Sequence, residues 1–123
     1  LRNKLDQIFR QAALEPPSLE AALQTAAGSG RVEPNRGRRI LQILLEEKQL
    51  VRLPADLIFH RMVLDELISK VRAYADKHKP DRSIDVGKFK ELAGVSRKYA
   101  IPLLEFLDRE RVTRRQGDRR VIL

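Results

Sequence analysis

The apolar pattern that most limits the possible fold occurs twice in the sequence, at an offset of 62 residues. The segment GRRILQILLEEKQLVRL aligns with YAIPLLEFLDRERVTRR, so that Leu41 matches Leu103, Leu44 matches Phe106 and Leu50 matches Val112. Each copy has apolar residues at three- and four-residue spacing, typical of an amphipathic helix, followed by a stretch typical of a short β-hairpin. The sequence therefore predicts two tandem units of one fold.

The first unit contains two further helices before this pattern. Apolar periodicity predicts a helix over residues 1–14, which Pro16-Pro17 ends, and a second helix that the hydroxyl of Ser18 can cap. We expect residues 28–30 (Gly-Ser-Gly) to end this second helix and Asn35 to precede the third. Residues 50–59 then predict a two-stranded hairpin, with its tip at residues 54–56.

The second unit begins with an apolar stripe over residues 64–75, which predicts a helix ending near Pro80. A short strand at 83–84, a helix capped by Asp85 and a tight turn at Gly94 lead into a helix that Ser96 can cap. Helix, helix, glycine turn, helix and hairpin is the order of a winged helix-turn-helix. The sequence predicts a mainly α fold with small β-hairpins, made of two tandem winged helix-turn-helix domains, residues 1–60 and 61–123.

The last helix and hairpin depart from local preference in two ways. Arg97 and Lys98 occupy the first helical turn, where the helix dipole disfavours cations. In the hairpin, a Gly-Asp turn sets Arg115 opposite Arg120, whereas a Gln-Gly turn sets Arg114 opposite Arg119, and like charges in such positions weaken a hairpin. Departures of this kind are expected at functional sites. We interpret these cations, which we expect to face one another, as a site for a polyanion.

The charge of the chain is unevenly distributed. The formal net charge is +8, and residues 66–123 hold fifteen Lys/Arg against nine Asp/Glu. Such a balance favours an acidic partner: a nucleic acid, a membrane surface or an acidic protein. The absence of cysteine excludes disulfides and thiolate chemistry and suits a cytoplasmic location. No apolar run approaches the roughly 20 residues of a membrane span. Because the chain begins at Leu1, we expect it to be part of a longer protein.

Motifs for catalysis are missing from the sequence. It has no GxxxxGK[ST] loop, GxGxxG turn or HExxH motif. His60 and His78 are interpreted as boundary or surface residues, and the acidic residues at 46–47 and 108–110 as solvated charge. We therefore predict a protein without catalytic residues, cofactor or metal, and expect a monomer.

Three further features leave alternatives open. Tyr99 could stack on an unpaired base, or it could pack against Val95 or the hairpin. Asp118 could accept hydrogen bonds from a guanine edge, or it could only stabilise the turn. Arg36, Arg38 and Arg39 form a secondary basic surface in the first unit, which we otherwise interpret as a spacer.

The last 28 residues carry the resemblance to a known family. The start SRKYA, the run PLLE and the hairpin TRRQGDRRV closely resemble the C-terminal end of the bacterial selenocysteine-specific translation elongation factor (SelB type). The predicted tandem layout extends the resemblance to the rest of the chain, where it is architectural. The resemblance implies that the chain is the factor's C-terminal pair of winged-helix domains, with the GTPase and tRNA-binding domains upstream.

In that family the last domain binds a messenger RNA hairpin, the selenocysteine insertion element, and so tethers the factor at a recoded UGA codon on the ribosome. The resemblance implies RNA-binding residues in two groups: Ser96, Arg97, Lys98 and Tyr99, and Arg114, Arg115, Gln116, Gly117, Asp118, Arg119 and Arg120. The rival predictions are a DNA-binding winged helix, as in transcription regulators, and a scaffold that docks on acidic protein surfaces.

Overall fold

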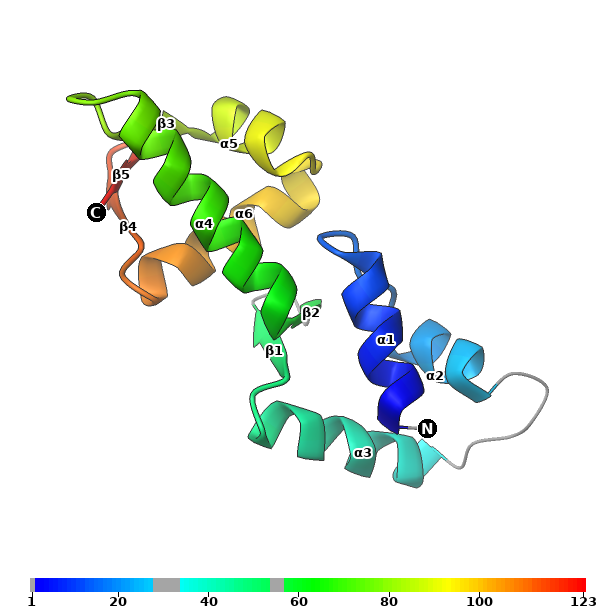
Figure 1. The fold of residues 1–123 in the computed structure, drawn as a ribbon. Helices are drawn as coiled ribbons and strands as arrows, with labels where there is room; N and C mark the ends of the chain where they lie inside the picture. The colour runs from blue at the N-terminus through cyan, green and yellow to red at the C-terminus, as the bar shows by residue number, and fades with distance from the viewer. Residues whose placement is uncertain (1, 28–33, 54–56) are drawn as a thin grey trace. The chain divides into compact units, whose positions relative to one another are not determined.

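The computed structural model describes residues 2–27, 34–53 and 57–123, and the chain folds as two compact units, Leu1–Val63 and Leu64–Leu123. Within the described ranges the fold is mostly helical, with small antiparallel sheets, as predicted (Figure 1). The predicted roles of residues 1–60 as a spacer and of residues 61–123 as the RNA-binding domain stay predictions.

Three helices and one hairpin form the first unit: α1 (Arg2–Ala12), α2 (Leu19–Ala27), α3 (Pro34–Glu46), β1 (Leu50–Leu53) and β2 (Leu57–His60). The Ser18 hydroxyl accepts from the backbone N–H of Ala21 at 3.2 Å, which confirms the predicted cap of α2. Asn35 lies inside α3 and not before it, because Pro34, which lacks an N–H, takes the first helical position. The predicted Gly-Ser-Gly helix end and the hairpin tip at 54–56 lie outside the described residues.

The core of the first unit joins all three helices to the hairpin. Leu5 and Phe9 of α1 pack with Ala22 of α2 and with Leu41 and Leu44 of α3. Leu50 of β1 and Ile58 of β2 complete this cluster. All these side chains are buried, as the apolar periodicity of the sequence requires.

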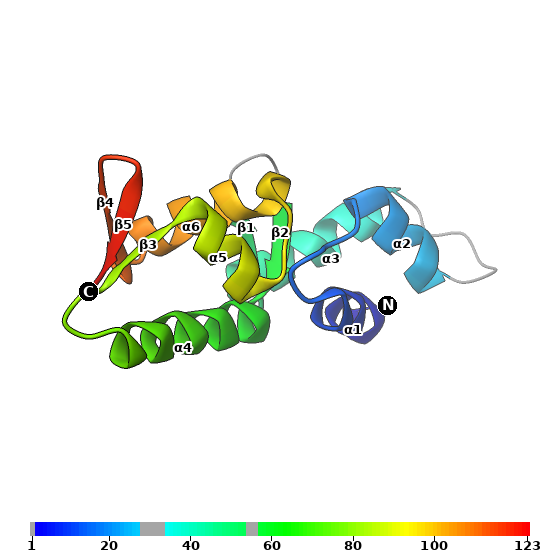
Figure 2. The same cartoon turned by 90° about the horizontal axis from the view of Figure 1, so that it is seen from above.

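The second unit consists of three helices and a three-stranded sheet. Helix α4 (Arg61–Lys77) begins in the first unit, and β3 (Ser83–Asp85), α5 (Val86–Ala93), α6 (Arg97–Arg109), β4 (Thr113–Gln116) and β5 (Arg119–Ile122) follow. The strand order is β3-β5-β4, and both pairs are antiparallel. Figures 1 and 2 show this sheet beside the C-terminal ends of α4 and α6.

The local signals that separate α5 from its neighbours act as predicted. Asp85 lies at the N-cap of α5, and its Oδ1 accepts from the backbone N–H of Lys88 at 2.7 Å. Gly94 ends α5 in the left-handed conformation, with φ of 71°, and its N–H bonds to the carbonyl of Lys90. The turn into α6 is thereby short, which is the helix-turn-helix arrangement.

The two units repeat one geometry, but the offset differs from the predicted 62 residues. Helices α3 and α6 have 13 residues each and begin 63 residues apart, as do β1 and β4. Lys48 and Arg111, also 63 apart, have positive φ after these helices. The offset returns to 62 at β2 and β5. The apolar pattern could not reveal the shift, because Leu103 and Leu104 are both buried, as are Phe106 and Leu107.

Candidate nucleic-acid interface

The hairpin β4–β5, called the wing below, carries most of the predicted site residues. A two-residue turn, Gly117-Asp118, joins its strands, and Gly117 has φ of 65°. Of the two predicted registers the structure has the first: Arg115 lies opposite Arg120 and Gln116 opposite Arg119. A glycine at the first turn position supplies the positive φ that two-residue hairpin turns require.

Alternation along the strands separates the wing arginines into two sets. Arg114 and Arg119 share the outer face of the wing, whereas Arg115 and Arg120 share the inner face with Thr113. The side chains of Arg114 and Arg119 are exposed and form no hydrogen bond or ion pair with the described residues. The Nε of Arg115 donates to the carbonyl of Gly117 at 3.2 Å, at the tip. The outer face therefore offers two cations without any side-chain partner among the described residues, whereas the exposed Arg115 of the inner face is bonded to the tip.

Arg120 corrects the prediction of an exposed arginine pair. It is 6% exposed, and its Nε and one terminal nitrogen each donate to Oδ2 of Asp108 at 3.3 Å. The other oxygen of Asp108 accepts from the Thr113 hydroxyl at 2.6 Å. Asp108 is thus a half-buried ion-pair partner and not solvated charge as predicted. Asp108 reduces the repulsion between Arg115 and Arg120 within the protein, so this like-charge pair is not evidence for a bound polyanion.

The second predicted group lies at the start of α6. Ser96 occupies the N-cap position with φ of −79° and ψ of 168°, but its hydroxyl does not form the predicted capping bond. The N–H groups of Arg97 and Lys98 have no acceptor among the described residues. Both side chains are exposed, and Nζ of Lys98 lies 5.3 Å from the ring centroid of half-buried Tyr99. This helix start offers two cations and free backbone donors.

We expected the two groups to face one another, but the structure places them apart. Helix α6 begins beside the end of α5 and ends at β4, so the Ser96–Tyr99 group and the wing lie at opposite ends of this helix (Figure 2). At 1.5 Å per residue, the 13 residues of α6 are about 20 Å long. No hydrogen bond, ion pair or ring contact joins the two groups within the described part of the chain. Any ligand that uses both groups must span the length of α6.

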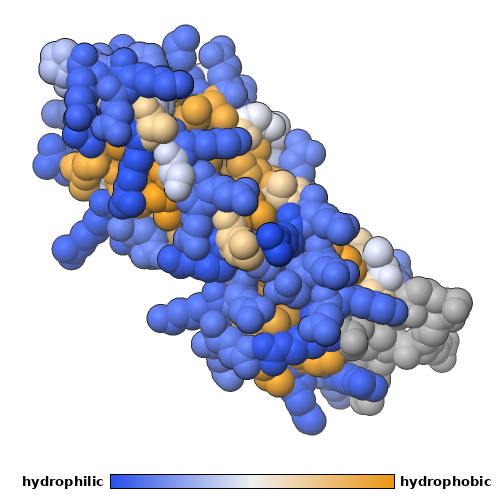
Figure 3. Space-filling view, in the orientation of Figure 1, coloured by the Kyte–Doolittle hydropathy of each residue, from blue (hydrophilic) through white to orange (hydrophobic). Residues whose placement is uncertain are grey.

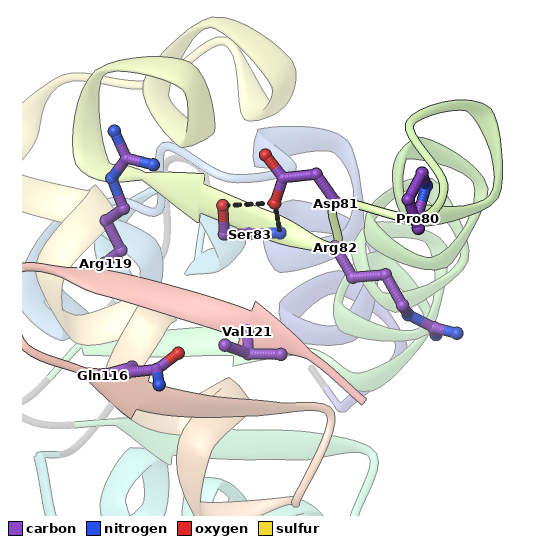
Figure 4. A pocket seen from close by; sticks show the side chains of 7 residues that line it. All are labelled: Pro80, Asp81, Arg82, Ser83, Gln116, Arg119 and Val121. Atoms are coloured by element: carbon purple, nitrogen blue, oxygen red, sulfur yellow. Dashed lines mark hydrogen bonds between the residues drawn. The ribbon is translucent and has the colours of Figure 1, made fainter.

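A hollow of about 480 Å³ lies beside the outer face of the wing sheet (Figure 4). Its lining joins the loop before β3 to the wing through Asp81, Ser83, Gln116, Arg119 and Val121, with Pro80 and Arg82 at one side. Gln116 and Arg119 were predicted site residues. Asp81 and Ser83 were not, because only the pairing of β3 with β5 brings them next to the wing.

Asp81 is held in its ionised form. Its Oδ1 accepts from the hydroxyl of Ser83 at 2.7 Å and from the backbone N–H of Ser83 at 3.0 Å. These two bonds, with weaker contributions from the charges of Arg119 and His78, hold the pKa of Asp81 below its ordinary value. The hollow therefore combines a carboxylate with the guanidinium of Arg119, so that acceptor and donor groups line one surface.

The first unit is less basic at the corresponding places. Arg36, Arg38 and Arg39 are exposed along α3. His60, expected at the unit boundary, ends β2 and is buried, with Nε2 at 2.9 Å from Asp6. His78 is exposed near the end of α4 and stacks on Tyr74.

The visible face of the second unit is mostly hydrophilic, with small hydrophobic patches between the polar side chains (Figure 3). Over the described residues, no group of three or more His, Asp and Glu side chains could hold a metal ion. No helix in the same ranges is long and apolar enough to cross a membrane.

Comparison with known proteins shows a similarity to SelB-type elongation factors. Residues 77–122 match the family model described as elongation factor SelB, winged helix. The whole sequence is 30% identical over 122 residues to the selenocysteine-specific elongation factor of Desulfomicrobium baculatum. The chain is thus similar to SelB proteins, through a family model over residues 77–122 and a relative matched along almost the whole chain. It covers 18% of the length of that SelB relative.

Two solved SelB structures share the fold. The bacterial selenocysteine-specific elongation factor EF-Sec matches 93% of this chain with a TM-score of 0.60 and 26% identity, and the chain covers 20% of that protein. The mRNA-binding domain of E. coli SelB, solved in complex with SECIS RNA, matches 99% of this chain with a TM-score of 0.70 and 21% identity. The chain covers 98% of that domain. These matches confirm the predicted SelB resemblance and the winged-helix fold.

Proposed function

We propose that this chain binds the SECIS hairpin of messenger RNA and tethers a selenocysteine-specific elongation factor there for UGA recoding. The observation that carries the proposal is the SelB winged-helix match over residues 77–122, the segment that contains α6 and the wing. Within that segment Arg97, Arg114 and Arg119 are exposed and lack ion-pair partners among the described residues. The similar E. coli domain was solved with SECIS RNA, which supports the same ligand class here.

The exposed cations would contact phosphates. Arg97 and Lys98 lie beside free N–H groups at the positive end of a helix dipole, and Arg114 and Arg119 lie on the outer wing face. An A-form duplex has a deep, narrow major groove, so α6 would contact its backbone and not enter the groove. Cations at both ends of α6 suit a ligand that lies along the helix.

The hollow would receive one unpaired loop base. Sequence-specific RNA recognition mostly uses unstacked bases, and guanine presents acceptors at O6 and N7 together with amide and amino donors. Arg119 supplies donors and Asp81 an acceptor on the same surface, whereas a phosphate would be repelled by Asp81. We therefore favour Asp81 over Asp118, the residue chosen from sequence, as the reader of a guanine. Asp118 lies exposed at the wing tip.

The remaining parts of the proposal concern the whole factor. GTP binding and contact with the ribosome would belong to other parts of a cytoplasmic factor, and this chain would act as a monomer without cofactor. The first unit would serve as a spacer, with Arg36, Arg38 and Arg39 as a secondary anion-binding surface.

A competition titration tests the proposal. A fluorescently labelled RNA hairpin carrying the selenocysteine insertion loop is bound by the chain and displaced by unlabelled competitors. We expect the parent hairpin to compete at least tenfold better than a hairpin of equal length with a replaced loop, and better than duplex DNA. Preference for the duplex would support a DNA-binding winged helix instead. Equal competition by all three would show non-specific polyanion binding and contradict the proposal.

A further inference from the structure

The contact between α6 and the wing differs in chemistry from its counterpart in the first unit. Asp108 is the twelfth residue of α6, Thr113 the first of β4 and Arg120 the second of β5. The residues at the same places of α3, β1 and β2 are Leu45, Leu50 and Ile58. The second unit thus has three polar residues, called the Asp108 cluster below, where the first unit has three apolar ones.

The apolar counterparts belong to an ordinary core. Leu50 and Ile58 are buried in the core of the first unit, and Leu45 packs against it. Apolar contacts therefore hold a hairpin of this geometry against its helix without any ion pair. Exchange of a buried ion pair for apolar residues of similar volume is often neutral or stabilising. Stability alone does not explain why the second unit has the Asp108 cluster.

The Asp108 cluster adds a fixed orientation of the wing strands relative to α6. One carboxylate accepts from the Thr113 hydroxyl on β4 at 2.6 Å and from two nitrogens of Arg120 on β5 at 3.3 Å each. Both strands are thereby tied to one point near the end of α6, with Thr113 and Arg120 buried. Hydrogen bonds need defined angles, whereas apolar contacts tolerate sliding. The same strands present Arg114 and Arg119 on the opposite face.

We propose that Asp108 is a positioning residue that fixes the orientation of the wing on α6 and so aligns Arg114 and Arg119 with the RNA backbone. The second half of this inference rests on the proposed RNA-binding function. The first half does not. Asp108 itself would not touch RNA, because its two oxygens are directed to Thr113 and Arg120.

The sign of a charge effect gives the first test. Glu105 lies on α6 as well and is exposed. Loss of a negative charge near a polyanion site tightens binding by simple electrostatics, so Glu105→Gln should bind the RNA hairpin as well as or slightly better than the parent. Asp108→Asn removes the same charge but should weaken binding at least fivefold, because the wing loses its fixed orientation. Equal or tighter binding by Asp108→Asn would overturn the proposal.

A variant that keeps the packing gives the second test. The triple variant Asp108→Leu, Thr113→Leu, Arg120→Ile copies the first unit and leaves the net charge unchanged. We expect it to fold, to bind the hairpin at least fivefold more weakly, and to lose most of the effect of a further Arg119→Ala substitution. If Arg119→Ala weakens the triple variant by the same factor as it weakens the parent, Asp108 has no positioning role.

Two more conservative variants keep the test valid if the triple variant does not fold. Thr113→Val removes only the hydroxyl, and Thr113→Ser retains it, so binding should fall in the first and stay within about twofold of the parent in the second. Residual dipolar couplings of the wing amides measure its orientation without RNA and should change in Thr113→Val only. Unchanged couplings would overturn the inference. If the parent does not bind the RNA hairpin, the proposed function is wrong. The couplings would still test whether Asp108 fixes the orientation of the wing.

Discussion

Simultaneous removal of the Arg114 and Arg119 charges tests which surface meets RNA, and the structure sets the size of the effect. Four exposed cations at the proposed site, Arg97, Lys98, Arg114 and Arg119, form no side-chain hydrogen bond or ion pair with the described residues. Arg115 is not counted because its Nε donates to the Gly117 carbonyl on the inner wing face, and Arg120 is not counted because Asp108 neutralises it. Each phosphate contact contributes roughly −0.7 to −0.9 to the slope of log K against log salt, so four contacts predict a slope of about −3 to −3.5. The double alanine variant should have about half that slope.

Fluorescence anisotropy titrations of the RNA hairpin between about 50 and 400 mM salt measure both slopes. A matched control replaces Lys70 and Arg72, two exposed cations of α4, by alanine and removes the same charge. The control should keep the parent slope, because a cation that does not contact a phosphate releases no counterion. If the control lowers the slope as much as the wing variant does, binding is spread over the whole basic surface and the wing assignment is wrong.

Three further predictions follow from individual contacts. Asp81→Asn should keep the affinity for the hairpin within about threefold but reduce discrimination between guanine and other loop bases about tenfold, measured by competition with loop variants. The pKa of Asp81 is lowered in the folded state, so its ionised carboxylate stabilises the fold above about pH 4, and this stabilisation is lost as the pH falls through the folded pKa. The free energies of unfolding of the parent and of Asp81→Asn, measured in urea, should therefore converge at acid pH. Nδ1 of His60 accepts from the N–H of Met62, so Nε2 carries the proton donated to Asp6, and Asp6→Ala should destabilise the first unit by about 1–3 kcal/mol in urea titrations. An unchanged unfolding midpoint would contradict that assignment.

The sequence was sufficient for the fold because local signals and apolar periodicity agree along most of it. Ser18, Asp85 and Gly94 each act where the sequence placed them, since a cap or a left-handed turn depends on only a few neighbouring residues. Ser96 shows the limit of such reasoning. It occupies the predicted cap position, yet its hydroxyl makes no capping bond, because residue type defines a position and not a rotamer.

The candidate site was less predictable, because its chemistry depends on pairing between distant segments. Asp81 lies next to Arg119 only through the pairing of β3 with β5, and no sequence spacing indicates that contact. The fate of Arg120 depends likewise on Asp108, twelve residues earlier in the chain. The one-residue error in the repeat has a different, local origin: adjacent apolar residues in α6 are both buried, so the pattern fits two alignments.

With the observed alignment, the two hairpins differ in the side chains that a polyanion would meet. The positions of Arg114 and Arg119 in the wing correspond to Val51 and Leu57 in the first hairpin, because β1 and β4 begin at matching places and so do β2 and β5. One backbone geometry therefore carries two cations in the second unit and two apolar side chains in the first. Phosphate binding at these two positions of the first hairpin is disfavoured for that reason, and the exposed arginines of α3 remain the secondary anion-binding surface that we propose for the first unit. Since both units share the fold, the division of roles that we propose rests on these side chains and not on the winged-helix architecture.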